Sequence, residues 1–276
     1  MGLPDRRRLI VNADDFGRSS SINAAVVRAH REGILTSASL MVNESSADEA
    51  VYLAQENPNL GVGLHLSLVC GKPALSSKDI PGLLNAETEF SKNAILSGLR
   101  FFFFPQLKPQ LRLEIEAQFQ KFRATGLALD HVNGHLNIHL HPVVLEILIE
   151  TAQRWGIRHL RLTSDPLALN LKLARGNFGY RASHALIYKI LSGRARSKLQ
   201  RANIGATQRV FGLLQNARVD ENFLLNLLPL LPNGDSELYS HPSLDNFKHE
   251  FDALISPQVK ELVAKLGIQL IRYKDL

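Results

Sequence analysis

Apolar and polar positions in the first 70 residues form two patterns, short apolar runs and longer stretches with helical spacing. The apolar runs are typical of buried strands, and serine, glycine and proline residues mark the ends of the helical stretches. In order, the pattern predicts a strand at 8–13, a helix through 22–33, a strand at 35–42, a helix at 46–58 and a strand at 60–69. Strands and helices that alternate at this spacing indicate a parallel α/β architecture.

The same alternation continues along the chain with two interruptions. Residues 71–104 and 165–205 break the rhythm, and we expect each to be an insertion. The other segments predict helices at 107–125, 142–156 and 220–232, strands at 127–134, 157–163, 208–214 and 236–243, and a last strand or extended tail at 268–276. About seven strand and helix units within one domain, 1–276, predict an α/β fold of the (β/α) barrel type, closed or incomplete.

Composition narrows the class of protein without changing this fold. The 276 residues are 45% hydrophobic and 21% charged, which is typical of a globular chain with a large core. The net charge of +6 favours acidic partners, but the basic residues are scattered, so we expect no nucleic-acid binding.

The single cysteine, Cys70, excludes an internal disulfide and suits a reducing compartment. The amino terminus resembles no leader and no apolar run is long enough to span a membrane, so we expect a cytoplasmic protein.

Polar side chains gather where the predicted strands end. Asp14 and Asp15 follow the first strand, His65 lies late in the third, the histidine-rich stretch 131–142 follows the fourth, and His241 follows the seventh. Because chemistry in (β/α) barrels takes place where strands run into the following loops, we expect these side chains to face one mouth. One carboxylate and two imidazoles suit a catalytic divalent metal, and a second carboxylate beside them suits a general base.

Each of these residues also has an interpretation without a catalytic role. The two aspartates suit a capped turn, and His65 suits a hydrogen-bonded histidine of the core. The stretch 131–142 fits a helix with a stripe of histidines, although its glycine and two asparagines argue against one. We expect the remaining histidines, at positions 30, 159, 184 and 249, to be surface or packing residues, and Cys70 to be a packing residue.

Four blocks of the sequence resemble the YdjC-like carbohydrate deacetylases. They begin with LIVNADDFG, GVGLHLSLV, LDHVNGHLN and ELYSHPS, and they are spread over most of the chain. The resemblance implies a (β/α) barrel related to the polysaccharide deacetylases, and removal of acetyl groups from N-acetylated sugars. The segment that includes GLRFFFFP resembles the branch associated with hopanoid biosynthesis, whose implied substrate is an N-acetylglucosaminyl hopanoid lipid.

The resemblance implies a role for each matched residue. Asp14 matches the family's general base, and Asp15, His65 and His135 match the ligands of one divalent metal ion. The ion is magnesium or zinc, and the imidazole ligands suit zinc better, since magnesium prefers oxygen.

Further residues of the matched blocks are expected at the same site. His139 matches a site histidine, His241 matches an acid or a substrate contact, and the sequence leaves open which of the two protonates the departing amine. We also expect Asn133, Phe16 and Asn43 to contact the substrate.

The expected partner is an N-acetylated sugar or a glycolipid. A lipid substrate would bring the protein into peripheral contact with the inner membrane surface, to which the basic excess and Phe101–Phe104 would contribute. A homodimer is compatible with the sequence.

Other functions remain open at this level. A soluble chitooligosaccharide is an alternative substrate, and a sugar-binding module without catalysis is an alternative class. A non-haem iron oxygenase uses the same ligand types, but its short motif is absent, and a retaining glycosidase needs a second carboxylate across the sugar. Release of acetate separates these readings.

Overall fold

The computed structural model describes residues 6–173, 177–215 and 217–276, and its strands form one parallel sheet. The strands are β1 (Arg7–Phe16), β2 (Ser37–Leu40), β3 (Gly61–Leu66), β4 (Val132–Gly134), β5 (Arg209–Phe211), β6 (Gly234–Ser240) and β7 (Gln269–Leu270). Their order is β4-β3-β2-β1-β6-β5, and β7 pairs with the first part of β1. All carboxyl ends therefore lie at the same edge.

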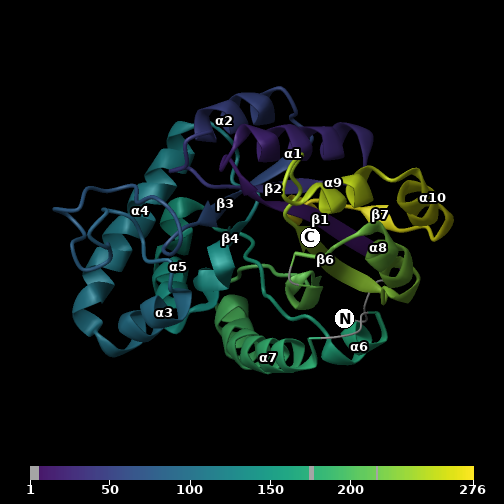
Figure 1. The fold of residues 1–276 in the computed structure, drawn as a ribbon. Coiled ribbons are helices and arrows are strands. Elements are labelled where there is room, and N and C mark those ends of the chain that lie inside the picture. The colour runs from purple at the N-terminus through teal and green to yellow at the C-terminus, as the bar shows by residue number, and fades with distance from the viewer. Residues whose placement is uncertain (1–5, 174–176, 216) are drawn as a thin grey trace.

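The sheet curls into an incomplete (β/α) barrel, which confirms the predicted fold class (Figure 1). The strand predicted at 157–163 is wrong, because this segment makes only isolated bridges, from Leu160 to Val132 and from His159 to Gly205. It crosses between β4 and β5, where the strands do not pair into a continuous ladder.

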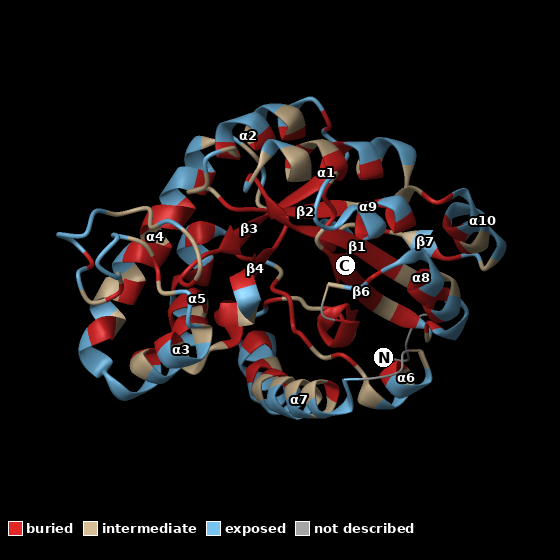
Figure 2. Ribbon diagram, viewed as in Figure 1, coloured by how far each residue is buried: buried red, intermediate tan, exposed pale blue. Residues whose placement is uncertain are grey.

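Helices surround the sheet as an outer layer (Figure 1). They are α1 (Ser20–Glu32), α2 (Ala47–Gln55), α3 (Ala94–Phe103), α4 (Lys108–Ala124), α5 (Pro142–Trp155), α6 (Leu167–Leu173), α7 (Phe178–Arg201), α8 (Glu221–Leu227), α9 (Lys248–Ile255) and α10 (Pro257–Lys265). Short 3₁₀ turns join some of them, including η2 (His135–Leu140) after β4. Figure 2 shows that the strands are buried and that the outer faces of the helices are exposed.

Local sequence explains why the elements begin and end where they do. In β1, the run from Leu9 to Val11 is fully buried, because helices cover the outer face of the curled sheet and side chains of the other strands fill its interior. Ser19 caps α1 by accepting a hydrogen bond from the backbone N–H of Ile22. Gly156 ends α5 in the left-handed conformation at φ 71°, which glycine adopts without steric cost.

Both insertions contain helices. The first, 71–104, ends in α3, which Asn93 caps by accepting a hydrogen bond from the N–H of Leu96. The second insertion, 165–205, contains α6 and the long helix α7. Neither α9 nor α10 was predicted, although Ser256 caps α10 and Pro257 occupies its first position. Across the described residues, we find no helix that is both long and apolar enough to cross a membrane.

Candidate metal and active site

The end of β1 directs two consecutive aspartates to the barrel mouth. Adjacent strand residues normally point to opposite faces, but the pairing of β1 with β2 shifts register between Ala13 and Phe16. Asp15 takes a left-handed conformation at φ 64°, and Gly17 follows at φ 93°. This irregularity breaks the alternation, so Asp14 and Asp15 both reach the same buried region and meet different partners.

Asp15, His65 and His135 bring three metal-binding atoms together, all within 4.8 Å of one another. The Oδ1 atom of Asp15 lies 3.0 Å from Nδ1 of His135 and 3.3 Å from Nε2 of His65. Neighbouring ligands of a tetrahedral zinc ion with bonds of about 2.0–2.1 Å are about 3.3 Å apart. The spacing therefore fits a shared cation, and the Oδ2 atom of Asp15 is held separately by Arg18 at 2.8 Å.

The hydrogen bonds around His65 give an independent reason to expect a cation. The Nδ2 group of Asn133 donates to Asp14 and Ser39, so its Oδ1 accepts the proton of His65 Nδ1 at 2.7 Å. A neutral His65 then presents an unprotonated Nε2 to the Asp15 carboxylate. Two acceptors that face each other repel unless a cation lies between them. The residues present therefore fit a divalent metal ion.

The electrostatics of Asp15 agree with this arrangement. Burial would raise the pKa of Asp15, but the imidazoles of His135 and His65 beside its carboxylate hold the pKa well below its usual range. The carboxylate therefore stays ionised at neutral pH, as a metal ligand must.

Asp14 belongs to a buried ion-pair network. The Nη1 and Nη2 atoms of Arg161 donate to its two oxygens at 2.7 and 2.9 Å, and Asn12 and Asn133 donate to Oδ1. Burial would raise the pKa of Asp14, but the charge of Arg161, with smaller contributions from His65 and His241, lowers it below its ordinary value. The carboxylate is therefore ionised and fixed in orientation.

Sequence reasoning missed Arg161 and its second partner. Arg161 is completely buried, and its Nε donates to Oε1 of Glu237 at 2.8 Å, while its guanidinium lies over the ring of Tyr239. Glu237 also accepts a hydrogen bond from the hydroxyl of Tyr273 near the carboxyl terminus. The available signal was a charged residue inside each of two predicted strands, Arg161 in 157–163 and Glu237 in 236–243, since charges that enter a core are almost always paired.

His241 lies at the end of β6 with 29% of its side chain exposed. Its Nδ1 is 3.8 Å from Oε2 of Glu250, an ion-pair distance rather than a hydrogen bond. Burial opposes protonation, but the Glu250 carboxylate and the charges of Asp15 and Asp14 raise the pKa of His241 to about 9. This imidazole is therefore protonated at neutral pH and reachable from solvent.

His139 has the opposite character. It is fully buried, and its Nε2 donates to the backbone oxygen of Arg161 at 3.0 Å. Burial and the charge of Arg161 lower the pKa of His139 to about 3, so this imidazole is neutral at neutral pH. Its Nδ1 is buried without a hydrogen-bond partner among the described residues.

The histidine-rich stretch does not form the alternative helix. Leu136 and Asn137 take left-handed conformations inside η2, so His135 and His139 do not share a helical stripe. His131 points away from the metal-binding atoms: it contacts Ser39 and Asp130 and stacks on Tyr273. Its role is therefore structural.

The three residues expected to contact substrate have different positions. Asn133 is fully buried and holds His65 and Asp14 in place, and Phe16 is fully buried in the hydrophobic core. Neither side chain therefore offers exposed surface to a substrate. Asn43 is partly exposed in the loop after β2, where its Nδ2 donates to the backbone oxygen of Lys72.

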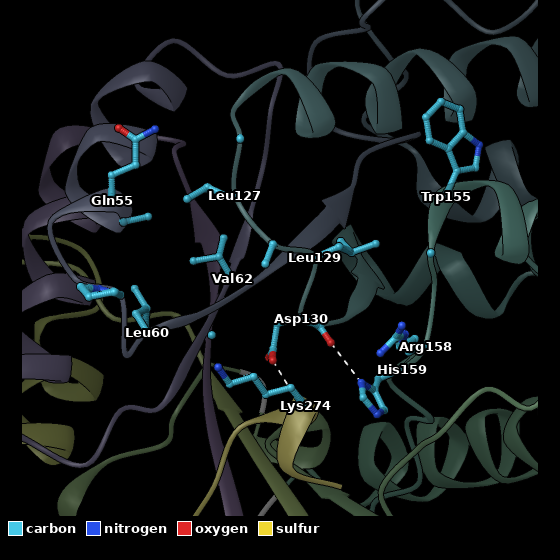
Figure 3. Close-up of a pocket in the computed structure, with 16 residues that line it drawn as sticks. Gln55, Leu60, Val62, Leu127, Leu129, Asp130, Trp155, Arg158, His159 and Lys274 are labelled. Atoms are coloured by element: carbon cyan, nitrogen blue, oxygen red, sulfur yellow. Dashed lines mark hydrogen bonds between the residues drawn. The ribbon is translucent and has the colours of Figure 1, made fainter.

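A cavity of about 660 Å³ lies at the other end of the strands (Figure 3). Its polar groups bind each other: the Asp130 side chain accepts from the Lys274 N–H, and the Asp130 backbone oxygen accepts from His159. The cavity contains none of the candidate metal ligands. It therefore does not belong to the candidate active site.

Comparison with known proteins gives the family. A model described as YdjC-like protein matches residues 8–265, so the chain belongs to the YdjC-like family. A carbohydrate deacetylase from Brevibacillus brevis is 42% identical over 152 residues, which cover 54% of this chain and 57% of that protein. The chain thus spans little more than half the length of that curated relative.

Longer alignments exist at lower identity. A carbohydrate deacetylase from Clostridium beijerinckii is 28% identical over 98% of this chain and 100% of that protein. A chitooligosaccharide deacetylase from Proteus mirabilis is 30% identical over 97% of this chain and 98% of that protein.

A solved structure supports the fold. An Enterococcus faecalis protein, provisionally described as a cellobiose-phosphate cleavage protein, has a TM-score of 0.74 and 21% identity, and the match covers 98% of this chain and 99% of that one. At this identity the likeness shows the fold alone.

Proposed function

We propose that this protein is a metal-dependent hydrolase that removes the N-acetyl group from an N-acetylated amino sugar. The observation that carries the proposal is the convergence of Asp15, His65 and His135 beside an ionised Asp14 and a protonated His241. The curated relatives named carbohydrate or chitooligosaccharide deacetylase support the same substrate class.

Asp14 is the general base in this proposal. Its Oδ1 already accepts three hydrogen bonds, from Asn12, Asn133 and Arg161, whereas Oδ2 accepts one, from Arg161, in the described residues. Oδ2 therefore keeps a lone pair with which to take a proton from the attacking water. The low pKa limits its basicity, so its main contribution is a fixed, ionised acceptor at the correct place.

His241 is the general acid. An acid must carry a proton and must reach the departing amine, and His241 is both protonated below about pH 9 and partly exposed. His139 meets neither condition, since it is fully buried and its pKa of about 3 leaves it neutral. We therefore assign the proton donor to His241 and a positioning role to His139.

Asp15, His65 and His135 would hold the metal ion. When bound, a divalent metal polarises an amide carbonyl and stabilises the negative charge that develops on its oxygen. Asn133 fixes the tautomer of His65, and Arg18 fixes the Asp15 carboxylate, so both ligands are oriented before binding. Two imidazoles among three ligands favour zinc over magnesium.

For the particular substrate we propose an N-acetylglucosaminyl hopanoid lipid. The support is the resemblance of the GLRFFFFP segment to the hopanoid-associated branch, and an apolar groove of about 380 Å³ beside the site. Leu136 lines this groove and directly follows His135. The apolar aglycone of a glycolipid would fill this groove. A soluble chitooligosaccharide has no apolar group to place in it.

Acetate release tests the proposal. Purified protein is assayed on N-acetylchitooligosaccharides and on an N-acetylglucosaminyl lipid, before and after chelation and after addition of zinc or magnesium. We expect chelation to abolish release and zinc to restore it, with faster turnover of the lipid. Absence of acetate from every substrate with every metal would reject the hydrolase. Equal turnover of both substrates would reject only the lipid preference.

A further inference from the structure

Most of the exposed large apolar side chains lie in one part of the protein. Sixteen are exposed among the described residues, and twelve of them lie on the two insertions and η2. Six lie between Ile95 and Phe104, four on α7, and the other two are Leu136 and Leu171. Phe103 is 66% exposed and Ile95 is 79% exposed, so most of each side chain is in contact with solvent and neither belongs to the hydrophobic core.

Several of these side chains line one groove. The groove of about 380 Å³ is lined by Ile95 and Leu99 from α3, by Leu136 from η2, and by Ile187 and Leu191 from α7. Figure 1 shows α3 and α7 along the same margin of the helical layer. We call this region, the exposed faces of α3 and α7 with the groove between them, the α3–α7 surface.

Two stretches that include α3 and α7 contain no acidic residue. Residues 90–113 contain four Lys or Arg residues and no Asp or Glu, and residues 166–219 contain ten Lys or Arg residues and no Asp or Glu. The whole chain has a net charge of only +6. The excess positive charge therefore lies in these two stretches, and the rest of the chain is acidic. Lys108 and Arg112 pair with Glu146 and Glu150 of α5, so the positive charge near the groove comes mainly from α7.

Helix α7 carries both kinds of side chain on one exposed face. Ile187, Ile190, Arg194, Lys198 and Arg201 follow each other at three or four residue intervals and are all exposed. The apolar members occupy the half near the groove, and the basic members occupy the other half. None of these three basic side chains forms an ion pair with another described residue, so their charge is available to a partner.

We propose that the α3–α7 surface docks the protein on an anionic lipid bilayer. Exposed phenylalanine and aliphatic side chains enter the interface, while the surrounding Lys and Arg side chains bind acidic headgroups. A second copy of this chain fits poorly, because two such faces would bring like charges together. The inference does not depend on deacetylation, since it rests only on exposure and charge.

Docking by this surface would also orient the candidate site. Leu136 lines the groove, and the preceding residue, His135, is a candidate metal ligand. The barrel mouth would then lie close to the headgroup region. A sugar attached to a membrane lipid also lies in the headgroup region, so it would be within reach of the barrel mouth.

Vesicle sedimentation tests the proposal directly. The full chain is mixed with vesicles of phosphatidylcholine alone or with about one third phosphatidylglycerol, at low and high salt. We expect binding only to the anionic vesicles, weakened by salt because screening shortens the range of the headgroup attraction. Phe103→Ser/Phe104→Ser removes apolar side chains that do not line the groove, and Arg194→Gln/Lys198→Gln removes two charges.

The expected losses are large enough to measure. Removing two charges should weaken partitioning by roughly 30-fold at low salt, and removing the two phenylalanines should weaken it by roughly 30-fold or more. Matched controls are Tyr52→Ser/Leu230→Ser and Lys121→Gln/Lys265→Gln, which change exposed residues elsewhere and should bind normally. Thermal unfolding verifies that each variant is folded.

Three outcomes would overturn the docking surface. The first is no binding of the wild-type protein to anionic vesicles, and the second is equal loss in the control variants. The third is a wild-type dimer that Phe103→Ser/Phe104→Ser converts to a monomer, since this would identify the surface as an interface between two copies. Acetate release from a soluble chitooligosaccharide, measured in the same preparations, reports on the proposed reaction separately.

Discussion

Replacement of Arg161 with methionine tests whether the buried network holds Asp14 in its ionised, oriented state. Arg161 has 1% of its side chain exposed, and the carboxylates it joins, Asp14 and Glu237, have 5% and 0%. Methionine keeps most of the length but removes the charge and all the donors. Two buried carboxylates then lose their compensating charge.

The expected loss of stability in Arg161→Met follows from this burial. Breaking a buried ion pair by removing one partner costs about 3–5 kcal/mol, because an uncompensated charge remains in a poorly solvated site. For a chain of this size, each kcal/mol lowers Tm by about 2–4 °C. We therefore expect Arg161→Met to unfold about 6–20 °C below the wild-type protein at neutral pH. Arg158→Met, which changes an exposed arginine three residues earlier, is the control.

The stability lost in Arg161→Met should depend on pH in a definite direction. In the wild-type protein the folded pKa of Asp14 lies below its ordinary value of 3.8, so the ionised group stabilises the fold above that pH, and this contribution is lost as pH falls through the folded pKa. Without Arg161, burial dominates and penalises the ionised form. The difference in Tm between wild type and Arg161→Met should be largest near pH 7 and should shrink toward pH 4.

A second substitution separates stability from catalysis. Arg161→Met/Glu237→Gln removes one of the two uncompensated charges and should recover roughly 1–3 kcal/mol of the lost stability. It should not recover acetate release, because Asp14 still lacks its partner. Calorimetry and the acetate assay are run on the same samples. An Arg161→Met protein that unfolds within 2 °C of wild type and keeps more than half its activity would refute the network's role.

The remaining predictions concern the proposed chemistry. Asp14→Asn should keep fold and metal content but lower acetate release by roughly 100-fold or more, and unchanged turnover would exclude Asp14 as the base. The wild-type rate should fall as pH rises through about 9, the pKa to which His241 is raised, and His241→Gln should be slow with no such alkaline decline; a decline that persists in the variant would point to another acid. His135→Ala should lose bound zinc measured by elemental analysis, and stoichiometric zinc in that variant would contradict the ligand assignment.

Much of the candidate site follows from local patterns and one topological rule. Asp15, His65 and His135 each lie at or just after the end of a strand that hydrophobic pattern predicts, and in a parallel sheet all carboxyl ends meet at one edge. Their convergence was therefore predictable although 120 residues separate Asp15 from His135. Ser19, which caps α1, and Pro142, at the first position of α5, likewise indicated where these helices begin.

Other features depend on distant contacts that no local pattern contains. The segment 157–163 has the composition of a strand, yet it crosses the opening of the barrel and uses Arg161 to bridge Asp14 and Glu237, which lie 147 and 76 residues away. Phe101 is 3% exposed and Phe102 is 57% exposed, because only the first faces the core when α3 packs on the barrel.

Sequence by itself determined a parallel α/β barrel and the residue types at its mouth, because strand periodicity and strand ends are local properties. Tertiary structure decided which groups are charged. His241 and His139 are both histidines in site motifs, but the first is protonated beside Glu250 and the second is neutral in a dry position beside Arg161. A pKa depends on burial and on neighbouring charges, and both arise only when remote segments pack together.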